Sequence, residues 1–119
     1  MPYTPVLISA STLSGDEVKN AYGEKLGHVK DIMIDTENNS VAYYVLSFGG
    51  LLGMGDKLFA IPPEAVALNT QEKCLTLNVE KKQLENAKGF HKDKWPNMAD
   101  PAFRNSLYKY YNISDRSAA

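Results

Sequence analysis

The run Val41–Phe48 (VAYYVLSF), which is apolar at nearly every position, constrains the fold of this chain more than any other segment. Successive side chains of a β-strand point to opposite faces of a sheet. By that alternation, one face of the run carries Val41, Tyr43 and Val45, and the other carries Ala42, Tyr44, Leu46 and Phe48. A strand that is apolar on both faces is usually buried on both. Because a barrel interior covers one face only, we expect a helix, a tail or a second subunit to cover the other.

The rest of the pattern predicts a mainly β domain. Short apolar or alternating runs between polar turns predict strands at Val6–Ala10, Val18–Ala21, Leu26–Asp35, Val41–Phe48, Leu58–Ile61, Val66–Leu68 and Cys74–Val79. A single helical turn is expected at Glu64 and Ala65, and a positive φ at Gly23 in a hairpin turn. Six to seven short antiparallel strands with tight turns indicate a small β-barrel or a strongly coiled sheet.

The run Leu26–Asp35 does not keep one alternation. Leu26, Ile32 and Ile34 share one parity, whereas Val29 and Met33 take the other. Two explanations are open: the strand contains a bulge near Gly27 or Lys30, or both of its faces are partly covered.

The C-terminal third has a different character. Residues 81–113 are predicted to form a helical extension that follows a barrel domain of residues 6–80. Asp100 is placed as a helix N-cap and Pro101 at the first helical position. Phe103, Leu107, Tyr110 and Tyr111 follow at helical spacing and form one apolar stripe. Residues 1–5 are expected to be a flexible arm and residues 114–119 a disordered tail.

Composition excludes some classes of protein. The 119 residues suffice for one domain, and the net charge of −1 gives no support for a nucleic-acid binder that depends on neutralising phosphates. The single cysteine, Cys74, cannot form an intramolecular disulfide and is expected to be an ordinary small residue on the outer side of its strand.

The sequence shows neither a membrane span nor a signal peptide. No apolar run approaches the roughly 18 residues that cross a bilayer. The N-terminal segment lacks the basic start and the long apolar core of a signal peptide. We therefore expect no membrane span and a cytoplasmic location.

The strand motifs resemble those of the PRC-barrel domain family. The resemblance rests on the order and spacing of Ile8–Ala10, Gly15–Val18, Gly23–Ile32, Val41–Gly50 and Ala60–Pro62, and it covers about residues 6–80. The segment Trp95–Pro101 resembles an extension found in stand-alone bacterial members.

This resemblance implies a small β-barrel that docks onto a larger assembly. The family includes the cytoplasmic part of the H subunit of purple-bacterial photosynthetic reaction centres and the C-terminal domain of a ribosome maturation factor. The sequence shows neither the transmembrane helix of the first nor the N-terminal domain of the second, so we expect neither specific role to transfer. No residue matches the acidic groups tied to proton delivery in the H subunit.

No chemical site stands out. The glycine-rich loop Gly49–Asp56 favours a structural turn over an apolar contact loop or an anion site, because it lacks the ending of a phosphate loop. His28 and His91 are too few for a zinc site. Asp31 and Asp35 lie about 13 Å apart along an extended strand, too far to work as a carboxylate pair. We expect no catalytic residue, no metal and no cofactor.

The favoured hypothesis is a non-enzymatic interaction or scaffold module that forms a homodimer and docks onto an unidentified protein assembly. The expected interface residues are Tyr44, Leu46, Phe48, Leu51, Leu52, Trp95, Phe103, Leu107, Tyr110 and Tyr111. Whether the C-terminal helix packs on its own barrel or across a dimer is left open. The alternatives are an RNA-associated or ribosome-associated factor, an accessory protein of a photosynthetic or electron-transfer complex, and a small enzyme or ligand-binding barrel.

Overall fold

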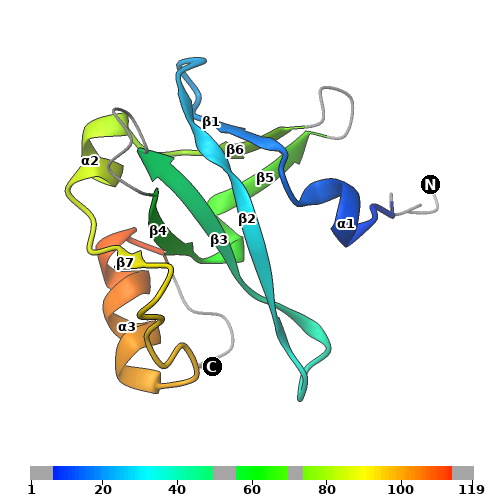
Figure 1. Ribbon diagram of the computed structural model, residues 1–119, viewed down its shortest axis with the longest axis vertical. Coiled ribbons are helices and arrows are strands. Elements are labelled where there is room, and N and C mark those ends of the chain that lie inside the picture. Colours follow the sequence, from blue (N-terminus) through cyan, green and yellow to red (C-terminus); the bar gives the residue numbers. More distant parts are fainter. Residues whose placement is uncertain (1–6, 50–55, 70–73, 114–119) are drawn as a thin grey trace.

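The computed structural model describes residues 7–49, 56–69 and 74–113 (Figure 1). The expected arm, the expected tail, and Leu51 and Leu52 of the glycine-rich loop lie outside these ranges. The elements are α1 (Ala10–Leu13), β1 (Glu17–Lys19), β2 (Lys25–Asp35), β3 (Ser40–Gly49), β4 (Asp56–Ile61), the 3-10 turn η2 (Pro63–Ala65), β5 (Val66–Asn69), β6 (Cys74–Leu77), α2 (Lys81–Glu85), β7 (Phe90–His91) and α3 (Pro101–Tyr110).

Seven strands form one strongly twisted sheet in the order β5-β6-β1-β2-β3-β4-β7 (Figure 1). The predicted mainly β fold with a C-terminal helix is thereby confirmed. Two details of the prediction are wrong for the described residues. The sheet is not closed, because β5 and β7 are its edges and do not pair with each other. One pairing is parallel, between β1 and β6, because these strands meet by a long connection and not by a hairpin.

The first predicted strand is also wrong. The chain from Leu7 to Ser9 has no regular structure, and Ala10–Leu13 forms a short helix. Leu13 is the buried residue of this helix, whereas Leu7 is 90% exposed. A five-residue apolar run does not distinguish a strand from a helical turn by periodicity alone, which explains the error.

Of the two explanations left open for Leu26–Asp35, a bulge is present, and it lies at Lys30. Val29 pairs with Leu46, and Asp31 pairs with the next residue of β3, Val45, so Lys30 has no opposite residue. A second shift leaves Ala42 unpaired further along the hairpin. Each bulge exchanges the faces to which the following side chains point. The first shift accounts for the broken alternation of Leu26–Asp35. The second makes the predicted faces of β3 wrong at its start, because Val41 packs on the side of Tyr44 and Ala42 on the side of Tyr43.

Strands β2 and β3 approach each other closely at Gly27. Its φ is +148°, and a Cβ atom built there would lie 2.1 Å from the carbonyl oxygen of Ser47. No other residue type fits this backbone without moving β3.

Most of the core lies inside the curve of the sheet. There Leu26, Val29, Tyr44, Leu46, Phe59, Ile61, Leu75, Leu77, Leu84 and Tyr111 form one cluster, with Leu13, Val18, Val79 and Ala87. A smaller cluster lies on the other side of β3 and β4 and is centred on Tyr43, Ala60 and Tyr108. Cys74 is buried, contrary to the expected outward position, on an interior strand of the sheet.

Candidate interaction surfaces

Helix α3 starts at the residues that the sequence indicates. The Asp100 carboxylate accepts a hydrogen bond from the Ala102 N–H at 2.9 Å, and Pro101 occupies the first turn. An N-cap of this kind satisfies a backbone donor that has no partner within the helix. The cap fixes where α3 begins and therefore which of its side chains face the sheet.

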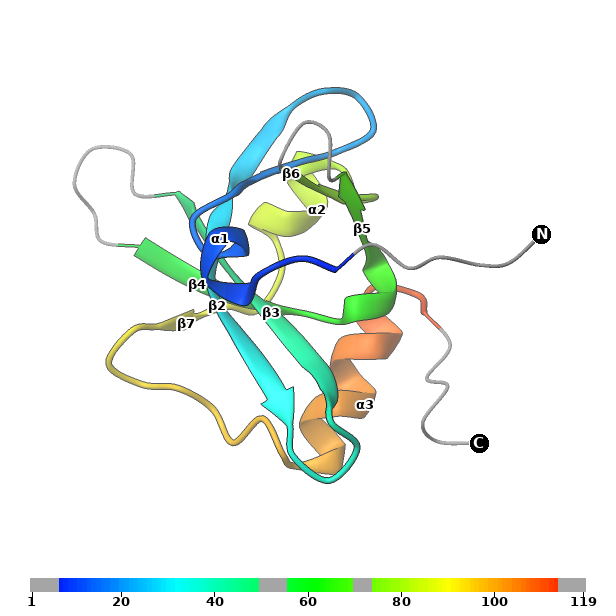
Figure 2. The same cartoon turned by 90° about the vertical axis from the view of Figure 1, so that its right-hand side faces the viewer.

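The outer face of the central strand is covered by α3 of the same chain. Tyr43 of β3 and Tyr108 of α3 are both buried in the smaller cluster. The rings of Tyr43 and Phe103 meet edge to face, with centroids 5.8 Å apart. Figure 2 shows α3 beside the far half of the β2–β3 hairpin. The second face of Val41–Phe48 therefore finds its cover within one chain.

A polar network fastens α3 to η2. The Tyr108 hydroxyl donates to the Glu64 carboxylate at 2.6 Å and accepts from the Arg104 guanidinium at 3.1 Å. The same guanidinium lies 4.5 Å from the centre of the Tyr108 ring. Tyr108 is the most buried residue of α3, yet the predicted stripe omits it. Its position one residue after Leu107, on the flank of the stripe formed with Phe103 and Tyr111, is the signal that could have identified it.

The predicted interface residues fall into three groups. Tyr44, Leu46 and Tyr111 are buried in the main core and offer almost no surface to a partner. Phe48, Phe103 and Leu107 are half-buried against the two clusters. Trp95 and Tyr110 are exposed, each at 39%. Of the predicted set that the structure describes, these two present the most surface.

Trp95 and Tyr110 are both held by contacts within the chain. The Trp95 ring lies 5.2 Å from the ring of Phe90 on β7. The Tyr110 hydroxyl donates to the carbonyl oxygen of Gln83 in α2 at 2.5 Å, so this side chain joins α3 to α2. Their contacts give both residues a role in holding the extension in place, whether or not a partner also touches them.

The Tyr111 hydroxyl is buried without a hydrogen-bond partner among the described residues. Burial raises the pKa of this phenol far above its usual value of 10.0, with a smaller contribution from the neighbouring Tyr110. The group is therefore neutral at every physiological pH and acts as a polar atom enclosed in an apolar core.

A surface groove with several apolar side chains lies between the far end of the β2–β3 hairpin and the start of α3. We call it the hairpin groove. It is lined by Met33, Ile34, Asp35, Thr36, Glu37, Ala42, Tyr43, Met98, Ala99 and Arg104. Ile34 is 55% exposed beside it, and Met33, Ala42 and Met98 are half-buried. Sequence reasoning did not identify this groove, because its two walls come from segments far apart in the chain.

The rim of the hairpin groove carries fixed charges. Asp35 Oδ1 accepts hydrogen bonds from the N–H groups of Glu37 and Asn38, and Oδ2 accepts from the Asn38 side chain at 2.9 Å. These bonds, that of the Asn38 side chain above all, lower the pKa of Asp35, and the nearby Arg104 lowers it further. The rim carries two acidic side chains, Asp35 and Glu37, and one basic side chain, Arg104, so its net charge is negative.

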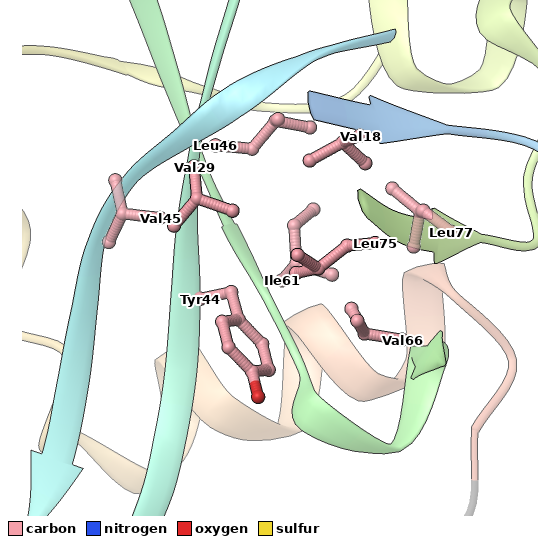
Figure 3. Close-up of a pocket in the computed structure, with 9 residues that line it drawn as sticks. All are labelled: Val18, Val29, Tyr44, Val45, Leu46, Ile61, Val66, Leu75 and Leu77. Atoms are coloured by element: carbon pink, nitrogen blue, oxygen red, sulfur yellow. The ribbon is translucent and has the colours of Figure 1, made fainter. Parts of the chain in front are cut away.

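Among the described residues, the interior of the sheet leaves no room for an organic ligand. Nine side chains line the space among the strands: Val18, Val29, Tyr44, Val45, Leu46, Ile61, Val66, Leu75 and Leu77 (Figure 3). The volume left between them is about 10 Å³. That is about the smallest cavity that admits one water molecule. Sites for small organic ligands usually enclose about 300–1,000 Å³.

The described residues show neither a metal site nor a membrane-spanning helix. They contain no group of three or more His, Cys, Asp or Glu side chains that could hold a metal ion. No helix within residues 7–49, 56–69 and 74–113 has the length and apolar character needed to cross a membrane.

Comparison with known proteins gives a family. A sequence model of the PRC-barrel domain matches residues 5–84. No curated protein matches the chain significantly. Among solved structures, that of RimM from Pseudomonas aeruginosa, a protein assigned to 16S ribosomal RNA processing, is similar over 63% of this chain, with 14% identity and a TM-score of 0.42. The match spans 45% of that protein's chain, and the likeness is too distant to transfer an activity.

Proposed function

This chain belongs to the PRC-barrel family, and we propose that it works as a cytoplasmic, non-enzymatic interaction module that forms a homodimer and docks onto a larger protein assembly. The observation that supports docking best is the hairpin groove, which joins a half-exposed Ile34 to the start of the C-terminal helix. Exposed apolar side chains that converge on a groove are typical of surfaces that bind a partner.

The lining of the hairpin groove favours one kind of partner. Its lining includes two methionines, Ile34 and Ala42, and unbranched methionine side chains adapt readily to different apolar shapes. Its rim is acidic through Asp35 and Glu37. We therefore propose that the partner is a protein segment that inserts a large apolar side chain next to a lysine or arginine.

Two alternatives have less support. A ligand-binding barrel needs an interior cavity, and the void here is about 10 Å³. An RNA-binding surface needs basic groups that neutralise phosphates, whereas the groove rim is acidic and the chain has a net charge of −1.

Affinity capture with variants tests the docking proposal. The full chain would be immobilised and exposed to an extract of its source cell, with bound proteins quantified by mass spectrometry. Ile34→Lys puts a cation beside the groove and should reduce capture of the specific partner at least about tenfold. Tyr22→Lys is the matched control, because Tyr22 is 74% exposed and lies outside the hairpin groove.

The proposal fails if the same proteins bind the wild-type chain and Ile34→Lys equally. Nuclease treatment of the extract distinguishes a protein partner from the main alternative, an RNA partner. If binding disappears after RNA is digested, and weakens steeply with salt, the partner is a nucleic acid and the protein-docking function is wrong.

A further inference from the structure

Strand β5 is an edge of the sheet. Among the described residues, Val66, Ala67 and Leu68 pair with β6 and with no second strand. An edge strand presents backbone N–H and C=O groups that can pair with another chain. Such edges are usually protected by charged residues or proline, and Val66–Asn69 contains neither.

The apolar inner face of the sheet continues out to this edge. In an antiparallel pair, directly opposite residues share one face. Val66 is opposite Leu77 and Leu68 is opposite Leu75, and both leucines of β6 are fully buried in the core. Leu68 therefore belongs to the core face of the sheet, yet it is 41% exposed. A closed barrel would bury this side chain, and the open sheet does not.

A second copy of the chain fits this edge. Two β5 strands running antiparallel about a two-fold axis at Ala67 would place Val66 of each copy opposite Leu68 of the other, on the inner face. Ala67 would meet Ala67 on the outer face, where the small side chain leaves space. No like charges would face each other, because the strand is neutral.

We infer that the homodimer forms by antiparallel pairing of β5 with β5 of a second copy, in the register centred on Ala67. This inference rests on the dimer part of the proposed function and is independent of the hairpin groove. A four-residue strand is only about 13 Å long, so this contact alone falls short of the roughly 1,200 Å² typical of a stable interface. The dimer is therefore weak and reversible, and it populates as concentration rises.

Sedimentation velocity of the full chain over a wide range of concentrations tests the inference. The wild-type mass should rise from one chain towards two. Leu68→Lys adds a cation to the exposed edge and should weaken association at least about tenfold, while Tyr22→Lys should leave it unchanged. Leu68 is already exposed, so its replacement should not prevent folding.

A disulfide cross-link tests the register. In a Cys74→Ala background, Ala67→Cys would bring two thiols together across the two-fold axis, with Cα atoms about 4.5–5.5 Å apart, a separation that a disulfide spans. Oxidation by diamide should give a covalent dimer, whereas Tyr22→Cys in the same background should not.

Three results would overturn the inference: a monomer at every concentration, a dimer insensitive to Leu68→Lys, or equal cross-linking through positions 67 and 22. A monomer whose amides at 66–69 are already protected from hydrogen exchange when dilute would show that another segment of the same chain covers the edge. The docking proposal is judged separately, because Leu68→Lys should still capture the partner of the hairpin groove.

Discussion

Two tyrosines of the C-terminal segment have opposite roles although both are buried. The Tyr108 hydroxyl lies between Glu64 and Arg104 and bonds to both. The Tyr111 hydroxyl has no hydrogen-bond partner in the described part of the chain. A buried hydroxyl contributes to stability only when its hydrogen bonds replace those it made to water. The same chemical group is therefore expected to stabilise the fold at one position and not at the other.

Removing each hydroxyl should reveal this difference. Tyr108→Phe should lower the free energy of unfolding by about 1–3 kcal/mol, because the Glu64 carboxylate loses a donor. Tyr111→Phe should leave it unchanged or raise it by up to about 1 kcal/mol, because an unsatisfied polar atom leaves the core. Urea unfolding of the two variants and the wild type measures both. Equal losses for the two variants would mean that Tyr111 has a partner.

At the level of the elements, the sequence predicted those structures that depend on local chemistry. The broken alternation gave a bulge near Lys30 as one of its possible causes, and Asp100 and Pro101 predicted the start of α3. The parallel pairing of β1 with β6 could not be predicted, because no local pattern specifies which distant strand a short strand joins. The hairpin groove was missed for the same reason, since Ile34 and Met98 become neighbours only when α3 packs.

The β2–β3 hairpin carries a pH-dependent turn at Asp35. The hydrogen bonds that Asp35 accepts lower the pKa of its carboxyl group in the folded chain below the ordinary value of 3.8. The stabilisation of the turn is therefore complete above that value and is lost as the pH falls through the lower folded pKa. In an NMR titration from about pH 6 to about pH 2, the amide signals of Glu37 and Asn38 should move with this carboxyl.

Asp35→Asn supplies the control for this titration. The amide oxygen can still accept the turn hydrogen bonds, and the side chain does not ionise. The same amide signals should then stay constant over that range. If they moved as in the wild type, Asp35 would not be the group that titrates, and its place in the turn would be in doubt.

For the whole molecule, α3 belongs to the folded unit although the family match ends at residue 84. It contributes Tyr108 to the smaller cluster, and Tyr111, directly after it, contributes to the main core. The extension thus reaches both sides of the central sheet. It is therefore an integral part of the fold and not a separate extension of a complete barrel domain.

Ending the chain after Asp100 should therefore destabilise the entire sheet. Burial of Tyr108, Tyr111 and their half-buried neighbours is lost, and we expect the free energy of unfolding to fall by about 3–6 kcal/mol. The reference is a chain ending at Ile113, which keeps every described residue of the extension. Thermal unfolding followed by circular dichroism compares the two. Equal midpoints would mean that the sheet folds independently of α3.

The parallel pairing of β1 with β6 also determines when this protein can fold during its own synthesis. A ribosome makes the chain from its N-terminus, so β1 and the β2–β3 hairpin are complete long before Cys74–Leu77 exists. Until then β1 has one unpaired edge, and the inner face of the hairpin lacks the leucines of β6. Pairings between distant segments form slowly and leave apolar surface exposed meanwhile. The nascent chain is therefore expected to be vulnerable to aggregation and proteolysis until its last third has been translated.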